Sequence, residues 1–203
     1  VLIANRGAIA CRILRTLREL QVEGVAVYSE ADAASLHILQ ADEAHSLGEG
    51  AAASTYLAVD KILAIAKATG ATAIHPGYGF LSENAAFAEA CANHGIAFIG
   101  PTPEQLRVFG LKHTARALAK QHGVPMLEGT ELLDSLDAAL IAGEQVGYPV
   151  MLKSTAGGGG IGMRVCRSAS ELSESFEAVK RLGQNNFSDA GVFIEMYIQR
   201  ARH

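Results

Sequence analysis

The chain has 203 residues, of which 49% are hydrophobic and 19% charged, which suits one large or two small folded domains and argues against disorder. Its 17 basic and 21 acidic residues give a net charge of −4, so charge offers no basis for nucleic-acid binding. No apolar run is long enough to span a membrane, and we expect no membrane contact.

The cysteines and the start of the chain bear on its compartment. Cys11, Cys91 and Cys166 are odd in number, far apart and without a C-x-x-C pair, which is typical of reduced thiols in a cytoplasmic protein. We expect each of them to fill space in a core. The chain opens on an apolar strand without a signal peptide, which suggests that a few leading residues are missing.

Short apolar strands alternate with helices over the first half of the chain. The expected strands are 1–4, 24–28, 44–47, 72–75 and 97–99, and the expected helices are 8–20, 33–40, 57–68 and 83–94. The first helix places four apolar residues on one face: Ile9, Ile13, Leu17 and Leu20. Ser54 or Thr55 is the expected cap of the third helix. This βαβα order predicts a parallel sheet covered by helices.

Two polar segments follow strands of this expected sheet. Asn5-Arg6-Gly7 follows the first strand, and the decapeptide 75–84, His-Pro-Gly-Tyr-Gly-Phe-Leu-Ser-Glu-Asn, follows the fourth. Ligands of open parallel sheets lie beyond the carboxyl ends of the strands, so both segments are placed for a site. We expect Arg6 to hold the turn, and the decapeptide to line the edge of a pocket or to serve structure, with Glu83 as a helix cap.

Gly100-Pro101 breaks the βαβα pattern, and we expect one domain over 1–110 and a second over 111–203. Thr102 and Gln105 form a capping box that opens a new helix. Further helices are expected at 112–122, 137–146 and from a second capping box at 168 to 182, with strands at 150–153, 163–167 and 192–195 and a polar loop at 185–191. This order predicts a small α+β domain.

A glycine-rich segment lies between two of these strands. Residues 156–163 read Ala-Gly-Gly-Gly-Gly-Ile-Gly-Met and follow Lys153 closely. Such a run costs entropy to order and packs no core, but it lets backbone N–H groups approach an anion. Lys153 would add a point charge for the same anion. The segment therefore predicts a lid over nucleotide phosphates, with a plain surface hairpin as the alternative.

Two familiar glycine motifs do not explain this segment. Gly157, Gly159 and Gly162 match G-x-G-x-x-G, but that fingerprint needs a helix directly after it, and a strand is expected here. No Lys-Ser or Lys-Thr pair closes the loop, so the Walker pattern is absent as well. A dinucleotide-dependent oxidoreductase would require a helix after Gly162.

Together these motifs resemble the biotin carboxylase component of biotin-dependent carboxylases, an ATP-grasp family. The resemblance rests on residues 3–10, on the decapeptide 75–84, on Phe-Ile-Gly-Pro at 98–101 and on the segment 153–163. It covers essentially the whole chain. It implies an α/β fold in which a Rossmann-like, pre-ATP-grasp domain over 1–110 precedes part of an ATP-grasp domain over 111–203.

The resemblance also implies a nucleotide site. The matching positions are Lys112, Lys153, Gly159, Gly160, Met163, Glu195, Met196, Tyr197, Ile198 and His203. Lys112 and Lys153 match lysines near the nucleotide and its phosphates, and 195–198 match the strand whose backbone and carboxylate hold adenine. His203 matches a histidine near the ribose. Catalytic residues and magnesium ligands are expected beyond residue 203, so no metal ligand is expected in this chain.

The implied reaction is the ATP- and bicarbonate-dependent carboxylation of biotin, with Mg²⁺ bridging the phosphates. Biotin would be attached to a separate carrier domain, and a carboxyltransferase domain of the parent chain would pass the carboxyl group on. We expect the 203 residues alone to be inactive, because the later half of the component is missing. A homodimer through the first domain is also considered.

Two positions bear on the final acceptor. Acyl-CoA and pyruvate carboxylases usually carry glutamate where this chain has Ala8 and arginine where it has Ile161. The combination found here resembles urea carboxylase, the carboxylase portion of urea amidolyase, which converts urea to allophanate. The alternatives are an acyl-CoA or pyruvate carboxylase, an ATP-grasp ligase that does not use biotin, and a non-catalytic interaction fragment.

Overall fold

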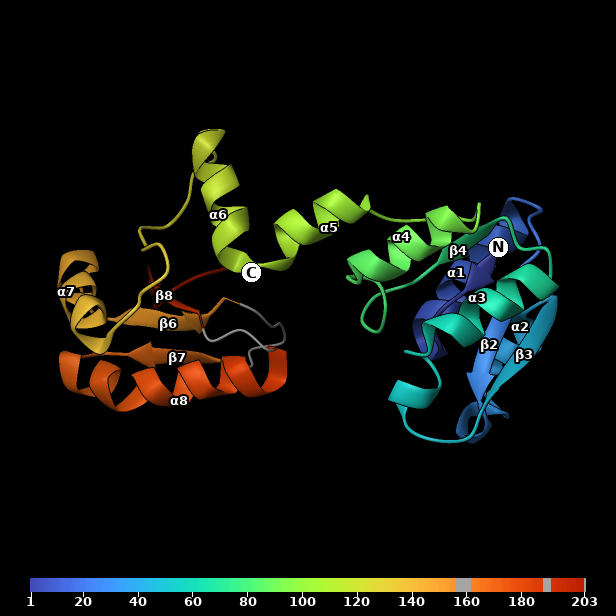
Figure 1. Ribbon diagram of the computed structural model, residues 1–203, viewed down its shortest axis with the longest axis horizontal. Helices are drawn as coiled ribbons and strands as arrows, with labels where there is room; N and C mark the ends of the chain where they lie inside the picture. The colour runs from blue at the N-terminus through green and yellow to red at the C-terminus, as the bar shows by residue number, and fades with distance from the viewer. Residues whose placement is uncertain (156–161, 188–190, 203) are drawn as a thin grey trace. The chain divides into compact units, whose positions relative to one another are not determined.

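Two units make up the chain, and each is built around its own β-sheet (Figure 1). The computed structural model describes residues 1–155, 162–187 and 191–202. The first unit is Val1–Arg107 and the second is Val108–His203. Among the described residues, no helix is long and apolar enough to cross a membrane.

The first unit contains a five-stranded sheet in which every neighbouring pair of strands is parallel. Its strands are β1 (Leu2–Ile3), β2 (Val25–Ser29), β3 (Glu43–Gly48), β4 (Ala73–His75) and β5 (Ala97–Phe98). Their order is β3-β2-β1-β4-β5, so the direction of winding reverses at β1, as in Rossmann-like sheets. The predicted Rossmann-like fold is confirmed.

Helices carry the chain between these strands, because parallel strands cannot be joined by tight turns. They are α1 (Gly7–Glu19), α2 (Leu36–Gln40), α3 (Val59–Ala68) and α4 (Ala85–Asn93), with short 3₁₀ turns η1 (Glu30–Asp32) and η2 (Ala52–Ser54). Helix α5 (Pro103–Gly110) follows the last strand. The alternation agrees with the prediction, with boundaries shifted by a few residues.

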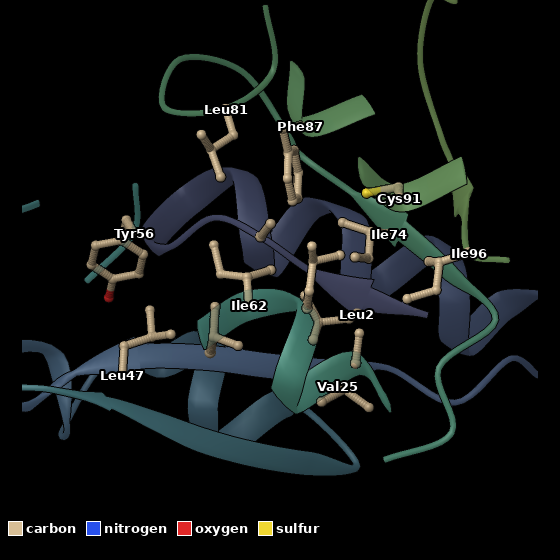
Figure 2. Packing of buried hydrophobic residues seen from close by; sticks show 14 residues of the cluster. Leu2, Val25, Leu47, Tyr56, Ile62, Ile74, Leu81, Phe87, Cys91 and Ile96 are labelled. Atoms are coloured by element: carbon tan, nitrogen blue, oxygen red, sulfur yellow. The ribbon is translucent and has the colours of Figure 1, made fainter. Parts of the chain in front are cut away.

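Both faces of the parallel sheet are buried. Leu2 packs with α3 and α4 in one apolar cluster, which Figure 2 shows from close by, while its neighbour Ile3 packs with α1 in another. Successive strand residues point to opposite faces, so helices must cover both sides. The predicted apolar face of α1 holds for Ile13 and Leu17, but Leu20 is 66% exposed because the helix ends at Glu19.

The helix caps partly differ from the sequence prediction. Thr102 and Gln105 form the predicted capping box, with N···O distances of 2.9 and 3.2 Å. Helix α4 is capped by Asn84 instead of Glu83, because the Asn84 side chain accepts the N–H of Phe87 at 2.9 Å. Helix α3 begins after Ala58 without a side-chain cap, so the predicted cap at Ser54 or Thr55 is wrong. The Thr55 hydroxyl donates to Ala51 O at 3.0 Å at the end of η2.

Two of the three cysteines lie in cores as predicted. Cys91 belongs to the first unit and Cys166 to the second, and both are fully buried. Burial raises the pKa of the Cys91 thiol to about 11, so it stays protonated at neutral pH. Cys11 on α1 is only partly buried.

The second unit contains a three-stranded antiparallel sheet with the order β7-β6-β8. Its strands are β6 (Val150–Ser154), β7 (Met163–Cys166) and β8 (Val192–Met196), and its helices are α6 (Lys112–Gln121), α7 (Leu136–Val146) and α8 (Ala169–Phe187). A strand follows Gly162 directly, as predicted, which excludes the dinucleotide fingerprint. Helix α8 continues to Phe187, so residues 185–187 are helical and not part of a loop as predicted.

One face of this antiparallel sheet packs against α7 and α8, and Figure 1 shows α8 running along β6 and β7. Leu152 and Ile194, which are paired across the strands, are fully buried on that face. Strand alternation places a different set on the opposite side, which we call the lysine face. Its residues are Met151, Lys153, Met163, Val165, Phe193 and Glu195.

Candidate functional site

Three charged side chains meet on the lysine face. The two carboxylate oxygens of Glu195 accept separate hydrogen bonds, one from Arg116 Nη1 and the other from Lys153 Nζ. The side chains are mostly buried, with 12% of Glu195, 19% of Arg116 and 23% of Lys153 exposed. Two cationic side chains share one carboxylate, so the formal charges of this cluster sum to about +1. A partly buried positive charge favours an anionic ligand.

The strand pairing explains why Lys153 and Glu195 meet. Met151 lies directly opposite Glu195 and Lys153 directly opposite Phe193 in the β6–β8 ladder. Lys153 and Glu195 are therefore diagonal neighbours on the same face, within reach of long side chains. The sequence prediction placed both residues at the nucleotide, and the structure joins them through a direct ion pair.

Arg116 joins this cluster from α6, and the sequence analysis missed it. Its Nη2 donates to Leu127 O at 3.1 Å, and its guanidinium lies 5.9 Å from the centre of the Phe193 ring. One signal was present in the sequence: Arg116 lies four residues after Lys112, so the two share one face of a helix. The pairing with Glu195 spans 79 residues and could not be read locally.

The start of α6 is fixed to the end of β6. Lys112 N donates to Thr155 O at 3.0 Å, and Lys112 Nζ donates to Ser154 O at 3.4 Å. A ring nitrogen of His113 hydrogen-bonds the Thr155 hydroxyl. The structure thus brings the predicted Lys112 to the strand end that leads into the glycine segment. His113 and Thr155 were not predicted for this site.

The far side of the glycine segment is built for close approach. Gly162 has φ +75°, and a Cβ there would lie 2.9 Å from Ser154 Cβ, so only glycine fits without strain. Its carbonyl accepts the N–H of Ser154 at 2.8 Å. Met163 lies opposite Lys153 in the ladder and shares the lysine face. The predicted residues Gly159, Gly160 and His203, and also Ile161, lie outside the described residues.

The segment predicted to hold a base is partly engaged within the fold. Met196 N donates to Glu128 O at 2.8 Å, and Tyr197 N donates to Pro149 O at 3.2 Å. Neither N–H group can serve a ligand without giving up its present acceptor. Ile198 is exposed and follows them directly. The predicted adenine contacts at 196–198 therefore depend on carbonyl groups or on Ile198.

The cationic groups of the cluster suit phosphate. Lys153 and Arg116 supply cationic donors, which match phosphate oxygens. Within the described ranges, no three His, Cys, Asp or Glu side chains converge as a metal site.

A second candidate site lies at the carboxyl ends of β1 and β4 in the first unit. A cavity of about 470 Å³ opens there, lined by Asn5, Arg6, Gly7, Ile9, Asp32, Tyr78, Gly79 and Phe80. Asn5 Nδ2 donates to Pro76 O at 2.7 Å and to Tyr78 O at 2.8 Å, which ties the two predicted loops together. The cavity occupies the point where the strand order reverses, where open α/β sheets bind ligands.

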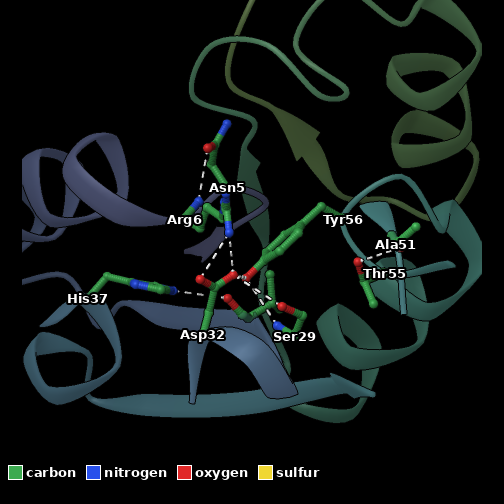
Figure 3. Close-up of polar contacts among 9 residues, drawn as sticks. Asn5, Arg6, Ser29, Asp32, His37, Ala51, Thr55 and Tyr56 are labelled. Carbon is green, nitrogen blue, oxygen red and sulfur yellow. Dashed lines mark hydrogen bonds and ion pairs between the residues drawn. The ribbon is translucent and has the colours of Figure 1, made fainter. Parts of the chain in front are cut away.

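Arg6 at this cavity is held by Asp32 (Figure 3). Its Nη1 lies 2.9 and 2.7 Å from the two carboxylate oxygens, and Asp32 also accepts the hydroxyls of Tyr56 at 2.7 Å and Ser29 at 3.1 Å. Burial opposes ionisation of Asp32, but the hydrogen bonds from Tyr56, Arg6 and Ser29 outweigh it and lower its pKa. Arg6 therefore fixes the turn after β1, as predicted.

The chain matches two families of known protein domains. Residues 1–106 match the family described as "Biotin carboxylase, N-terminal domain", and residues 112–203 match "Carbamoyl-phosphate synthase L chain, ATP binding domain". The chain is 50% identical over 203 residues to urea amidolyase of Lachancea kluyveri, 49% over 205 to the α subunit of mitochondrial methylcrotonoyl-CoA carboxylase of Rattus norvegicus, and 50% over 204 to biotin carboxylase of a Nostoc species. All 203 residues of the chain are matched in each case. The matched part makes up 11%, 28% and 46% of the length of the three relatives, in the same order.

The fold of the chain is also similar to solved structures of biotin carboxylases. A biotin carboxylase–βγ-ATP complex from Campylobacter jejuni matches 98% of the chain with a TM-score of 0.94 and 41% identity, and the chain covers 45% of it. The biotin carboxylase domain dimer of Hydrogenobacter thermophilus 2-oxoglutarate carboxylase, in complex with MgADP, ADP and bicarbonate, matches 98% with a TM-score of 0.90 and 39% identity, and the chain covers 44% of it. The chain belongs to the biotin carboxylase family.

Proposed function

We propose that this chain is part of an enzyme that carboxylates biotin with ATP and bicarbonate, and that its second unit binds the ATP. The observation that carries the proposal is the cluster of Lys153, Glu195 and Arg116 on a face that leads into the glycine segment. The match of residues 112–203 to an ATP-binding domain supports the same assignment.

In this proposal the residues of the site have separate roles. Lys153 binds phosphate oxygens and stabilises the charge that develops as the γ-phosphoryl group leaves ADP for bicarbonate. Glu195 and the chain at 196–198 contact the base. Met163 supplies apolar surface beside it, and Lys112 adds positive charge near the end of β6.

The proposed reaction has two steps. Bicarbonate oxygen attacks the γ-phosphorus, the bond to the β,γ-bridging oxygen breaks, and ADP and carboxyphosphate form. A ureido nitrogen of biotin then forms a bond to the carboxyl carbon and loses its proton, while the C–O bond to phosphate breaks and inorganic phosphate leaves. Carboxybiotin carries the group to the next active site. The chain spans less than half the length of the relatives above, so this activity is proposed for a protein that contains it.

We further propose urea as the final acceptor, with allophanate as the product. Ala8 and Ile161 support this branch, because the acyl-CoA and pyruvate branches usually carry charged residues at both positions. Ala8 is exposed on the first turn of α1, between Gly7 and Ile9, which line the cavity at β1. Overall identity does not separate the branches, since urea amidolyase and methylcrotonoyl-CoA carboxylase match almost equally well.

The test is bicarbonate-dependent ADP release by the full-length, biotinylated protein that contains this chain. We expect ADP release to require bicarbonate and to rise with urea, but not with acetyl-CoA or pyruvate. Lys153→Met should abolish most of it, whereas Lys120→Met, which removes an exposed lysine of α6, should not. If the rate of ADP release does not change with urea, urea is not the acceptor. If ADP is released at the same rate without bicarbonate, the proposed carboxylation reaction is wrong.

A further inference from the structure

The charge balance around Glu195 depends on an arginine that is not among the predicted site residues. Lys153 and Arg116 each bond a different carboxylate oxygen of Glu195. Without Arg116, Glu195 and Lys153 would form a neutral pair, and the lysine charge would be cancelled locally. With Arg116, the same three groups keep one net positive charge at the start of the glycine segment.

We propose that Arg116 is a positioning residue that balances Glu195, so that Lys153 keeps its positive charge available for nucleotide phosphates. This inference rests on the proposed ATP binding by the second unit. It assigns Arg116 an effect on phosphates without requiring that Arg116 touch them, because the effect is exerted through Glu195.

The surroundings of Arg116 hold it in this position. Its second nitrogen donates to Leu127 O, and its guanidinium lies over the Phe193 ring, so the fork is fixed from three sides. Gly129 packs so closely that a Cβ there would lie 2.7 Å from Arg116 Nη2. Leu127 and Gly129 belong to a segment that also bonds β8, through Thr130 N to Ile194 O at 2.8 Å.

These contacts also explain why arginine suits the position. A guanidinium can bond the carboxylate and a carbonyl at once with its planar fork, whereas a lysine ammonium is a compact point charge on a flexible stem. Lysine at this position would keep the charge but lose part of the geometry. The charge and the shape of Arg116 can therefore be tested separately.

The experiment compares variants of the full-length protein in which the net charge of the cluster differs. The wild type has a net charge of +1, Arg116→Met has 0, Glu195→Gln has +2, and the double variant Arg116→Met/Glu195→Gln returns to +1. Arg116→Lys also keeps +1. Lys120→Met serves as the matched control, since Lys120 is exposed one turn further along α6 and is not part of the cluster.

The measurement is the affinity for ATP, for ADP and for adenosine by calorimetry, at two salt concentrations. We expect Arg116→Met to weaken ATP and ADP by about tenfold, the size of one charge-assisted contact, and adenosine much less. The ratio of ATP to adenosine affinity should then recover in the double variant and exceed the wild-type ratio in Glu195→Gln. Arg116→Lys should retain most of that ratio.

Several outcomes would overturn the inference. Equal losses for ATP and adenosine in Arg116→Met would indicate a merely structural role, and an unchanged ATP affinity would indicate no role. A double variant that stays as weak as Arg116→Met would refute the balance through Glu195. If Arg116→Met does not fold, Arg116→Lys and Glu195→Gln still test whether the ratio of ATP to adenosine affinity rises with the net charge of the cluster. Failure of the wild type to bind ATP would instead refute the proposed function.

Discussion

The two sheets of this chain present their polar groups in different places. In the parallel sheet Leu2 and Ile3 are adjacent, point to opposite faces and are both fully buried, so polar groups are found at the strand ends. In the antiparallel sheet Leu152 is fully buried, while the next residue, Lys153, takes part in an ionic cluster. When helices cover both faces of a sheet, a ligand can bind only at the ends of the strands. When helices cover one face, a ligand can bind on the other face.

Adjacent residues of β6 should therefore differ sharply when replaced. We expect Leu152→Ala to lower the free energy of unfolding by about 2–5 kcal/mol, because it opens a cavity between the sheet, α7 and α8. Lys153→Met should cost less, about 1.5 kcal/mol, because Glu195 keeps its hydrogen bond from Arg116, yet it should abolish most ATP binding. Urea denaturation and nucleotide titration of both variants measure this contrast. Similar losses of stability would show that the lysine face is part of the core.

The strand ends of the parallel sheet should depend on Asp32. We expect Asp32→Asn to cost about 1–3 kcal/mol at neutral pH, because it weakens the bonds from Arg6, Tyr56 and Ser29. Glu89→Gln removes the exposed pair with Arg107 and should cost about 0.5 kcal/mol or less. Urea midpoints of the two variants provide the comparison.

The cost of Asp32→Asn should also depend on pH. The folded protein lowers the pKa of Asp32, so its carboxylate contributes stability above its unfolded pKa of about 3.9. That contribution is lost as the pH falls through the folded pKa. The difference in stability between wild type and Asp32→Asn should therefore shrink below about pH 4. A difference that grows on acidification would contradict this assignment.

The smallest expected effect concerns the cap of α4. We expect Asn84→Ala to cost about 1 kcal/mol, because the Phe87 N–H loses its acceptor. Glu83→Ala, one residue earlier and exposed, should stay within about 0.5 kcal/mol. Thermal unfolding of the two variants decides between the cap predicted from the sequence and the one in the structure. A larger loss in Glu83→Ala would favour the sequence prediction.

Local patterns in the sequence were sufficient for the elements and for part of the site. Alternation of apolar residues predicted the strands of both units, and the capping box at Thr102 and Gln105 formed as expected. Lys153 could be named because it ends a short apolar strand just before the glycine segment, whereas Glu195 was named through the resemblance to biotin carboxylases. These features depend on residues a few positions apart, and short-range geometry is encoded directly in sequence spacing.

The tertiary structure decided which distant residues meet. The pairing of β1 with both β2 and β4 places Asn5 against the loop at Pro76, and the packing of α6 places Arg116 on Glu195. It also decided that Asn84, and not Glu83, caps α4. Such contacts follow from how whole elements bury their apolar faces together, and no local pattern specifies which side chains that burial brings into reach.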